Sequence, residues 1–354
     1  MAEKLTALSK FAYQPKQKMP TGIDPLDTIL NGGPEQGDLI GVASKQGGGK
    51  STMLLQLSKI FIDEYDLKVA YIDAERGVKQ EILRNMDLEK YLGDRFYLTN
   101  MCSTYADVSE YLDAVLKDPK FGLVVIDSIT SVVPTKLLEK DVESQEMALK
   151  ARAMTAFIDK YRGALANANI ITFAIVQYRK NLNQTFYGAS EYNTAAPMAL
   201  NHACDVMLHI TTSQSKERAL FDVRETANGK VDTKVGAVHY LWAEKNKHAV
   251  PNIKVNFPVK YGLEVSNFEY LKRLLKDKKL RERGGSWINN IAGTPVKLQG
   301  ESGLNEYLAQ NFDSIRQQLF EQGAYDLITL NHLYDAEFNN NIEVYDLDEN
   351  ETQA

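Results

Sequence analysis

Residues 42–55 read VASKQGGGKSTMLL, and this stretch decides the fold class. Its apolar start is typical of a strand, its three consecutive glycines can bend a loop inward without a Cβ clash, and a helix is expected from Lys50. Backbone N–H groups at the N-terminus of a helix attract phosphate oxygens. A lysine in this position can reach the β- and γ-phosphates of a nucleotide, and a following serine can contribute its hydroxyl to Mg²⁺.

The stretch therefore predicts a phosphate-binding loop, with one departure from the usual pattern. Ser44 stands where the first glycine normally turns the chain out of the strand. Taken alone, the stretch also fits a glycine-rich turn that binds no ligand. The contacts expected for a nucleotide are Ser44, Gln46, Gly47, Gly48, Gly49, Lys50, Ser51 and Thr52, with Ser51 as a metal contact.

Apolar runs alternate with helical stretches on both sides of this loop. Strands are expected at 38–44, 68–75, 95–100, 122–129, 169–177, 205–212, 238–246 and 252–261, and helices at 50–64, 79–90, 105–117 and 144–167. Strands that are apolar throughout and separated by helices indicate a mainly parallel sheet covered on both faces. The later strands, joined by turns such as TANGK at 226–230, indicate hairpins. The fold class is therefore α/β.

Composition places the chain among soluble globular proteins and excludes several other classes. Its 354 residues are 44% hydrophobic and 25% charged, as in ordinary cytoplasmic domains. The two cysteines, Cys102 and Cys204, lie too far apart in the sequence to suggest a disulfide framework or a metal motif. We find no stretch that resembles a signal peptide or a membrane span, so a cytoplasmic location and no membrane partner are expected.

The sequence suggests four segments. An N-terminal arm is expected at 1–18, with Leu5, Leu8 and Phe11 on one side of a short helix, and a nucleotide-binding core at 19–262. A small C-terminal α+β domain is expected at 263–332, mostly helical with a turn that contains Gly and Trp. Residues 333–354 hold seven acidic and no basic residues, which leaves 41 basic against 40 acidic residues elsewhere. This tail either keeps the protein soluble or competes with a polyanion for a basic surface, for which 271–283 is the candidate.

Polar side chains follow three other expected strands. Asp127 ends an apolar strand and suits the Mg²⁺ shell, although a helix cap is the alternative. Glu75 follows a second strand, where a carboxylate could orient an attacking water or form only a surface salt bridge. Gln177 ends a third strand and could hydrogen-bond a γ-phosphate or water. Such positions meet at the carboxyl edge of a parallel sheet.

Further stretches carry a resemblance to a known family. PTGIDPLDTILNGGPEQGDLIGVASKQGGGKST at 20–52 is followed in order by YIDAE, LVVIDS, EMALKARAM, AEKNKHAVP and GGSWI. From about residue 19 to 311 the chain resembles the RecA-type ATPase core, most closely that of the DNA strand-exchange recombinases of bacteria and their phages. The resemblance implies a RecA-like P-loop core with a mainly parallel central sheet flanked by helices, and ATP with Mg²⁺ as its cofactors.

Lys245 and Lys247 gain a role from this resemblance. Strand alternation places both on one face with Asn246 opposite, and two neighbouring ammonium groups suggest a phosphate partner. In the recombinases similar lysines come from the adjacent subunit and contact the γ-phosphate. A solvated strand end is the alternative. The catalytic set implied is Lys50, Glu75, Gln177, Lys245 and Lys247.

DNA contacts are implied for two loops, at about 135–147 and 178–198, and for the helix after the first loop. Arg179 and Lys180 would contact phosphates, while Met147 and Leu182 match apolar residues that wedge between bases in relatives. A core position for Met147 and solvent exposure for the loop bases are the alternatives. The implied DNA-binding residues are Met147, Arg152, Thr155, Arg179, Lys180 and Leu182.

The chain departs from the family pattern at several positions. Ile82 stands where a tyrosine stacks on adenine in bacterial relatives, Ala196 and Pro197 replace a glycine pair, and Asp159 replaces a basic residue. These departures put individual base and DNA contacts in doubt. Together with the short N-terminal arm, they favour a phage origin.

The resemblance implies an ATP-dependent recombinase. Copies of the chain would form a helical filament on single-stranded DNA and pair it with homologous duplex DNA, with DNA-stimulated ATP hydrolysis. A single-strand-binding protein or a loader would be an accessory partner. Two alternatives remain at this stage: a hexameric helicase motor built on the same core, and a regulatory ATPase that binds a protein partner.

Overall fold

A ten-stranded sheet forms the centre of the computed structural model, which describes residues 16–45, 47–135, 146–180, 192–194, 198–212, 219–226 and 229–322. Six strands are parallel, in the order β7-β1-β5-β4-β2-β3. Their bounds are β1 Leu39–Ser44, β2 Lys68–Asp73, β3 Phe96–Thr99, β4 Phe121–Asp127, β5 Ile171–Lys180 and β7 Val206–Thr212. The expected mainly parallel sheet is thus confirmed.

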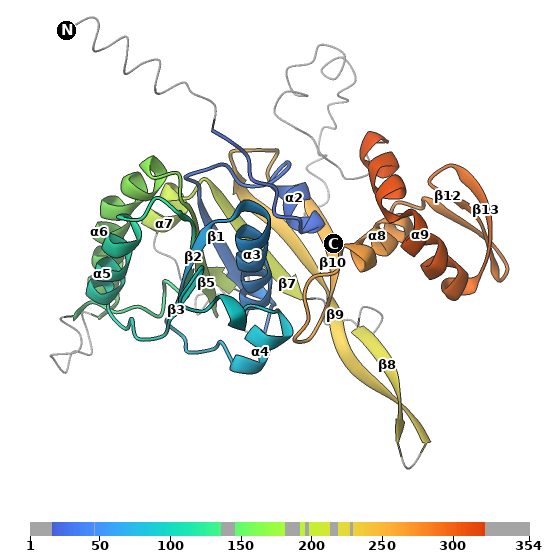
Figure 1. The fold of residues 1–354 in the computed structure, drawn as a ribbon, viewed down its shortest axis with the longest axis horizontal. Helices are drawn as coiled ribbons and strands as arrows, with labels where there is room; N and C mark the ends of the chain where they lie inside the picture. The colour runs from blue at the N-terminus through green and yellow to red at the C-terminus, as the bar shows by residue number, and fades with distance from the viewer. Residues whose placement is uncertain are drawn as a thin grey trace, which may run out of the picture.

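Antiparallel strands extend this sheet on one side. β9 (Gly229–Asn246) pairs with β7, β10 (Lys254–Lys260) pairs with β9, and β8 (Ala219–Thr226) forms a hairpin with the first half of β9. The hairpin expected at TANGK is confirmed, because Thr226 pairs with Gly229. β9 is nevertheless 18 residues long and begins nine residues earlier than expected. The hairpin projects well beyond the body of the molecule (Figure 1).

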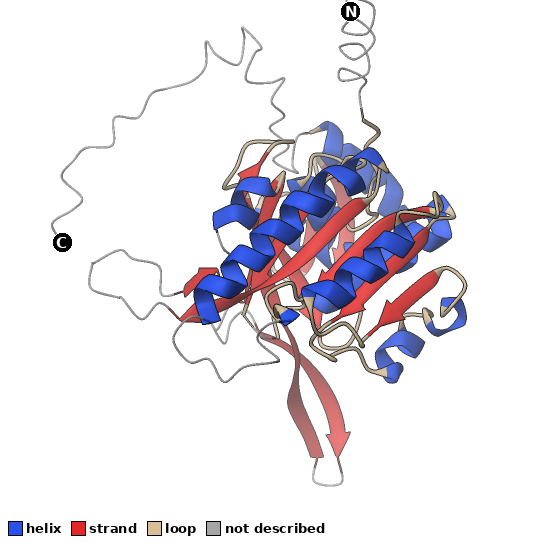
Figure 2. Ribbon diagram, turned by 90° about the vertical axis from the view of Figure 1, so that its left-hand side faces the viewer, coloured by secondary structure: helices blue, strands red, loops and turns tan. Residues whose placement is uncertain are grey.

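Helices cover both faces of the sheet, as the apolar strands require. On one face lie α2 (Asp24–Ile29), α3 (Lys50–Tyr65), α4 (Gln80–Asn85) and a 3-10 turn (Glu89–Tyr91), and on the other lie α5 (Tyr105–Val115), α6 (Glu146–Asn167) and α7 (Met198–Ala203). Figure 2 shows helices of this second face lying over the strands and running along them. All residues of β1 and β4 are buried.

Side-chain alternation along β1 separates two apolar layers. Ile40 and Val42 pack with Leu54 of α3, while Leu39 and Ala43 pack on the side of α5 and α6. Burial of one such aliphatic side chain contributes about 1.5–3 kcal/mol. The two layers therefore fix β1 in the middle of the sheet, and with it the start of the loop that follows.

The C-terminal part combines helices with a small sheet, as the expected α+β domain requires, but one stretch differs from its expected form. Residues 283–300 were expected to form a turn, but β11 (Arg281–Gly284), β12 (Trp287–Ile291) and β13 (Thr294–Gln299) form an antiparallel sheet between α8 (Asn267–Asp277) and α9 (Gly300–Glu321). The reason lies in the hairpin turns: Ala292 and Gly293 have φ values of 52° and 88°, which suits a two-residue loop between paired strands. An antiparallel sheet is therefore part of this C-terminal region.

Arg316 of α9 ties the C-terminal region to the rest of the chain. Its guanidinium donates to both carboxylate oxygens of Asp24 in α2, at 2.5 and 3.0 Å. The Asp24 side chain is fully buried, and burial raises the pKa of this carboxyl while the arginine opposes the shift. A bidentate pair of this kind also fixes orientation. It holds α9 against α2.

Several expected features lie outside the described residues. These are the arm at 1–15, most of the first loop, Leu182 with most of the second loop, and the acidic tail. The second loop is shorter than expected, since β6 (Tyr192–Thr194) pairs with Tyr178–Lys180 of β5. Within the part of the chain that the structure describes, no helix is both long and apolar enough to cross a bilayer.

Candidate nucleotide site

Four strand ends predicted from the sequence meet around one cavity. The cavity has a volume of about 240 Å³ and lies where the phosphate loop leaves β1. Its lining contains six of the eight residues predicted on the loop and the three predicted at the ends of β2, β4 and β5. Four residues at the end of β10 and one on β9 complete the lining. The lining residues are Gly47, Gly48, Gly49, Lys50, Ser51, Thr52, Glu75, Asp127, Gln177, His239, Val259, Lys260, Tyr261 and Gly262.

Glycine is needed at positions 47, 48 and 49 of the loop for two different structural reasons. Gly47 and Gly49 have φ values of 76° and 80°, in the left-handed region that other residues avoid. Gly48 has no such constraint, but a Cβ there would lie 2.4 Å from Oγ of Ser44. Ser44 therefore closes position 48 to any side chain. Gln46 lies outside the described residues.

Ser44 holds the loop lysine. The Lys50 ammonium donates to Ser44 Oγ at 2.7 Å and to the carbonyl oxygens of Ser44 and Lys45 at 3.4 and 3.2 Å. Ser44 itself is fully buried and is not part of the described cavity lining. Burial lowers the pKa of Lys50, and the nearby carboxylates of Asp127 and Glu75 raise it. The residue that replaces the first glycine is thus an acceptor for the lysine, where the sequence suggested a direct nucleotide contact.

Asp127 lies within hydrogen-bond distance of the loop. Its Oδ2 accepts from Ser51 Oγ at 2.6 Å and from the hydroxyl of Tyr71 at 2.9 Å. Burial raises the pKa of Asp127, and these two hydrogen bonds oppose that shift. A serine hydroxyl beside a carboxylate is a donor set of hard oxygens, which suits Mg²⁺ next to a phosphate loop. Ser51 and Asp127 therefore fit the metal role predicted for them.

Tyr71 is a member of this group that sequence reasoning missed. It is fully buried in β2, and burial beside Asp127 raises the pKa of its hydroxyl. The available signal was a hydroxyl in an otherwise apolar run, since a buried phenol normally needs a partner. Tyr71 therefore holds the carboxylate of Asp127 from the neighbouring strand β2.

Glu75 and Gln177 contact each other at the mouth of the cavity. Gln177 Nε2 donates to Glu75 Oε1 at 2.8 Å, and Ser131 Oγ approaches the same oxygen at 3.4 Å. The Glu75 backbone N–H donates to the carbonyl of Asp127 at 3.2 Å, which links the two carboxylates through the main chain. Gln177 was predicted to be the last residue of its strand. The strand is longer, because β5 continues to Lys180.

An aromatic side chain lines the cavity, but it does not come from position 82. Ile82, predicted to replace an adenine-stacking tyrosine, packs against the core beside α3, and the described lining does not include it. Tyr261 follows β10 and lines the cavity with 54% of its surface exposed. The sequence placed no residue of 259–262 at the site, because only the antiparallel pairing of β10 with β9 brings this segment beside the loop.

His239 is the second lining residue that the sequence did not reveal. It lies on β9, is 1% exposed, and its Nδ1 is 3.2 Å from Oγ1 of Thr212. Its Nε2 has no hydrogen-bond partner among the described residues. Burial lowers the pKa of His239 to about 4. The imidazole is therefore neutral at physiological pH.

A pH dependence of stability is expected from His239. Between its ordinary pKa of 6.5 and its folded pKa of about 4, the unfolded chain binds the proton and the folded chain does not. The free energy of unfolding therefore falls as the pH falls through this range. The contribution between pH 7 and 4.5 is about 2–3 kcal/mol.

Urea unfolding at pH 7 and pH 4.5 measures this effect. His239→Gln should lose less stability on acidification than the parent chain by about 2–3 kcal/mol. His202→Gln is the matched control, because His202 is exposed on α7. Equal acid sensitivity of His239→Gln and the parent would contradict the assignment.

Lys245 and Lys247 lie away from this cavity. Lys245 pairs with Met207, and Val206 pairs with Ile40 near the start of β1, whereas the loop follows Ser44 at the opposite end. The separation between Ile40 and Ser44 along the strand is roughly 13 Å. The two lysines and the phosphate loop of one chain therefore occupy opposite edges of the sheet.

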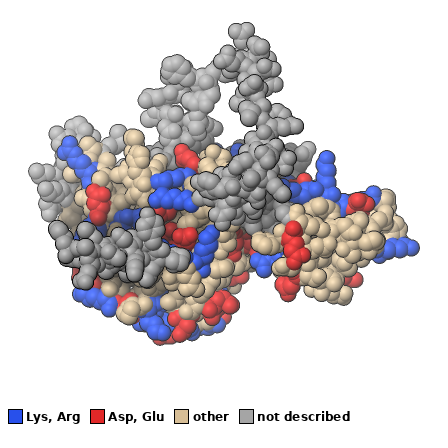
Figure 3. Space-filling model, turned by 90° about the horizontal axis from the view of Figure 1, so that it is seen from above, with Lys and Arg blue, Asp and Glu red and all other residues tan. Residues whose placement is uncertain are grey.

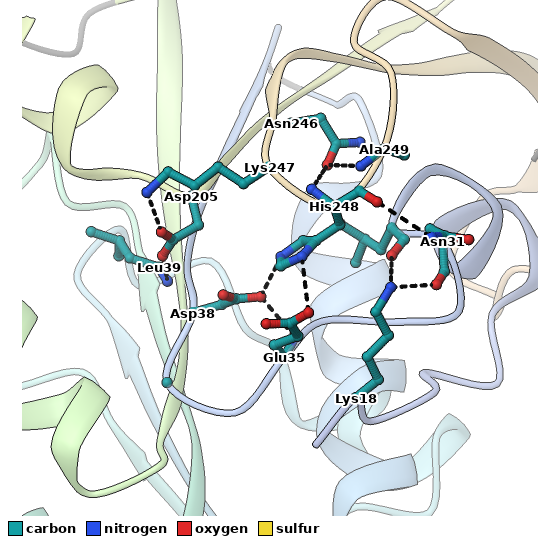
Figure 4. Close-up of polar contacts among 12 residues, drawn as sticks. Lys18, Asn31, Glu35, Asp38, Leu39, Asp205, Asn246, Lys247, His248 and Ala249 are labelled. Atoms are coloured by element: carbon teal, nitrogen blue, oxygen red, sulfur yellow. Dashed lines mark hydrogen bonds and ion pairs between the residues drawn. The ribbon is translucent and has the colours of Figure 1, made fainter. Parts of the chain in front are cut away.

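The two ammonium groups have separate partners within the chain. Lys245 donates to the carbonyls of Asn201 and His202 at 3.0 and 2.8 Å, and Lys247 donates to Asp205 Oδ1 at 2.8 Å. β9 ends at Asn246, so Lys247 lies just past the strand and the expected alternation applies only to Lys245. Figure 4 shows Lys247 directed toward Asp205.

The turn after Lys247 is held by a buried polar cluster. His248 Nε2 is 2.7 Å from Asp38 Oδ2, and its Nδ1 is 3.5 Å from Glu35 Oε1 (Figure 4). Asn246 donates to the carbonyl of Ile29 at 2.8 Å. These contacts fix the backbone on both sides of Lys247 while its side chain remains 56% exposed.

The predicted DNA-binding residues are only partly described. Arg152 is exposed on α6, and Thr155 donates to the carbonyl of Ala151 at 2.9 Å within the same helix. Met147 lies in the first turn of α6, and Arg179 and Lys180 pair with β6 through their backbone. The side chains of these last three residues and all of Leu182 lie outside the described residues.

The basic stretch at 271–283 is partly neutralised by its neighbours. Arg281 and Arg283 both contact Glu301, at 3.1 and 2.7 Å, and Arg273 contacts Asp277 at 2.8 Å. Over the wider face shown in Figure 3, basic and acidic side chains are intermixed. The segment at 271–283 therefore offers a weaker positive field than its sequence predicted.

A strand, a phosphate loop and a helix at the carboxyl edge of a parallel sheet define a P-loop nucleotide-binding protein. Residues 3–266 match the family model of the RecA N-terminal domain, and the chain belongs to this family. The family and the loop together identify a RecA-type ATPase.

Two sequence relatives agree with this assignment. Protein RecA of Leifsonia xyli subsp. xyli (strain CTCB07) is 26% identical over 300 residues, which cover 84% of this chain and 78% of that protein. Protein RecA of Geobacter metallireducens is 26% identical over 297 residues, covering 83% and 80%. The crystal structure of the RadB recombinase aligns with 70% of this chain and 99% of its own at 20% identity and a TM-score of 0.48. A phage origin gains no support from these relatives.

Proposed function

We propose that the protein is an ATP-dependent recombinase that assembles on single-stranded DNA and pairs it with homologous duplex DNA. One observation carries the proposal: Lys245 and Lys247 lie at the sheet edge opposite the phosphate loop. A nucleotide in the cavity of one copy is out of their reach within that copy. If the lysines act on a nucleotide, it belongs to a neighbouring copy.

The cavity residues then take distinct roles in hydrolysis. Lys50 leaves Ser44 to contact the β- and γ-phosphates, and Ser51 with Asp127 holds the Mg²⁺ shell. Bound Mg²⁺ would neutralise charge on the phosphate oxygens. Glu75 orients the attacking water and Gln177 contacts the γ-phosphate, since their side chains already meet at the cavity mouth.

Contact between lysines of one copy and the cavity of the next defines a head-to-tail assembly. Such heterologous contacts produce an open helix unless their rotation closes into a ring. In this assembly we assign 1–18 to an arm that reaches the neighbour, 19–262 to the ATPase core, 263–332 to the C-terminal domain and 333–354 to an acidic tail. We assign the DNA contacts to three residues of α6, to the last two residues of β5 and to one residue beyond it: Met147, Arg152, Thr155, Arg179, Lys180 and Leu182.

Two measurements on the full chain test this proposal together. ATP turnover is measured with and without single-stranded DNA, and the assembly is imaged by electron microscopy under the same conditions. A recombinase gives DNA-stimulated turnover and open filaments, and it pairs a labelled strand with homologous duplex. Closed rings would indicate a helicase motor, and turnover indifferent to DNA would indicate a regulatory ATPase.

A further inference from the structure

The side chain of His209 connects β5 and β9 by hydrogen bonds to Tyr178 and Glu244. It lies on β7, is 4% exposed, and stacks on Trp242 of β9 with ring centroids 4.3 Å apart. Its Nδ1 is 2.5 Å from the hydroxyl of Tyr178 on β5, and its Nε2 is 2.9 Å from Oε2 of Glu244 on β9. The three side chains form a continuous hydrogen-bonded chain across the sheet.

The chemistry of the partners fixes the direction of these hydrogen bonds. Burial lowers the pKa of His209, so the imidazole is neutral and carries one N–H, while Glu244 raises it. An ionised carboxylate only accepts, so Nε2–H donates to Glu244 and Nδ1 accepts from Tyr178. The chain therefore runs in one direction, from the Tyr178 hydroxyl through His209 to Glu244.

One small residue on β1, Ala43, lies beside this bridge. β1 lies between β5 and β7, and it ends at Ser44, which pairs with Gln177. Tyr178 is one residue further along β5 and lies past the end of β1. The β1 residue beside His209 is Ala43, whose side chain leaves the space above it to the tyrosine. β5 and β7 thus contact each other over the end of the strand between them.

Glu244 occupies an irregular position in β9. Leu208 pairs with Ala243 and Met207 pairs with Lys245, so Glu244 is an extra residue with no partner on β7. A β-bulge of this kind bends its strand and changes the direction of the residues that follow. The residue that follows is Lys245, with Lys247 two positions beyond. His209 therefore holds the bend from which both lysines project.

We infer that Tyr178, His209 and Glu244 are positioning residues that couple the two nucleotides a protomer contacts. β5 carries Gln177 at the protomer's own cavity, and β9 carries Lys245 and Lys247 toward the neighbour's cavity. This inference rests on the proposed function for the role of the lysines. The tie between β5 and β9 stands on the contacts within one chain.

Gln177 provides the step that starts the coupling. Its amide donates to Glu75 at 2.8 Å, and a γ-phosphate in the cavity competes for the same amide. Movement of Gln177 displaces Tyr178, the next residue in the strand, and alters the hydrogen bond to His209. His209 then shifts against Trp242 and Glu244. Nucleotide in one cavity in this way sets the geometry of the lysines offered to the next.

Trp242 reports this movement directly. The chain has two tryptophans, so Trp287→Phe leaves Trp242 as the only one. In this background, Mg²⁺ with a non-hydrolysable ATP analogue should change Trp242 emission in dilute protein without DNA. Adding Tyr178→Phe should reduce the change at least about fivefold, because the phenol loses the one hydrogen bond to the ring. Calorimetry should show analogue affinity within about twofold of the parent, since Tyr178 is not in the cavity lining.

A matched tyrosine separates the relay from general effects of the substitution. Tyr111 donates at 2.7 Å to the carbonyl of Tyr97, which lies in β3 at the opposite edge of the sheet. Tyr111→Phe should leave the Trp242 response intact. An equal response in Tyr178→Phe, or the absence of any Trp242 response to bound analogue, would overturn the tie between β5 and β9.

Turnover on single-stranded DNA tests the effect on the lysines. Glu244→Leu should lower kcat about tenfold, equivalent to one lost hydrogen bond, with KM for ATP within about twofold. Glu244→Gln keeps an oxygen that accepts from Nε2 and should retain most of the turnover. Full turnover in Glu244→Leu would overturn the positioning role, and if this variant does not fold, Tyr178→Phe is assayed in its place with the same expected loss.

The outcome distinguishes this inference from the proposed function. If Lys247→Ala leaves DNA-stimulated turnover unchanged, the role of the lysines fails whatever Trp242 reports. If Lys247→Ala removes that turnover while Glu244→Leu and Tyr178→Phe keep it, the proposed function stands and the relay fails.

Discussion

Lys50→Ala is expected to abolish ATP turnover in a protein that remains folded. Lys50 is only 9% exposed, and its ammonium lies 2.7 Å from Ser44 Oγ. It is beside the glycines that would surround the phosphates. Loss of a preorganised cation at developing charge costs at least about 10²–10³ in kcat. The buried position also means that folding removes the ammonium from water, which lowers its pKa. Removal of this charge should therefore cost little stability.

Phosphate release and thermal unfolding measure the two parts of this prediction. Lys59→Ala is a matched control on the same helix, because Lys59 pairs with Asp63 at the surface of α3. The control should keep parental turnover. Turnover of Lys50→Ala within tenfold of the parent would show that the loop does not bind the reacting phosphates.

Lys247→Ala is expected to remove DNA-stimulated hydrolysis and to leave nucleotide binding by single subunits intact. The residue lies at the sheet edge opposite the cavity, so its loss cannot disturb the loop of the same chain. A cation supplied from a neighbour to a phosphoryl-transfer site contributes about 10³–10⁵ in rate. Lys160 similarly pairs with an aspartate, Asp113, at the surface of α6, and Lys160→Ala is the control.

Mixed assemblies test whether the lysine acts across a subunit contact. Lys50→Ala and Lys247→Ala are each inactive alone, but a Lys50→Ala copy can offer its Lys247 to the intact loop of a Lys247→Ala copy. In a random equal mixture of head-to-tail copies, about a quarter of the contacts combine both lysines. Turnover of the mixture should recover to about that fraction of the parent. No recovery on mixing would contradict a shared site.

The local parts of the site could be predicted from the sequence because they depend on neighbours in the chain. The loop and α3 follow β1 directly, and the helix begins at Lys50 as expected. Asp127, Glu75 and Gln177 could be placed together because parallel strands share one carboxyl edge. Ser51 and Asp127, which were predicted to share a metal site, therefore contact each other in the structure.

The remaining parts depend on pairings that the sequence does not encode locally. His239 and Tyr261 reach the cavity because β9 and β10 are added antiparallel at the edge of the sheet. β9 ends at Asn246, so alternation along the strand could not place Lys247. The hairpin turn at Ala292 depends on positive φ values, which are uncommon outside glycine.

The contact between Ser44 and Lys50 has a consequence for how a nucleotide enters. In most phosphate sites the cation must shed water when the anion arrives. Lys50 sheds its water earlier, during folding, because the Ser44 hydroxyl and two carbonyls take the place of the hydration shell. The incoming triphosphate therefore meets a preorganised ammonium, and it replaces three protein acceptors with a charged one.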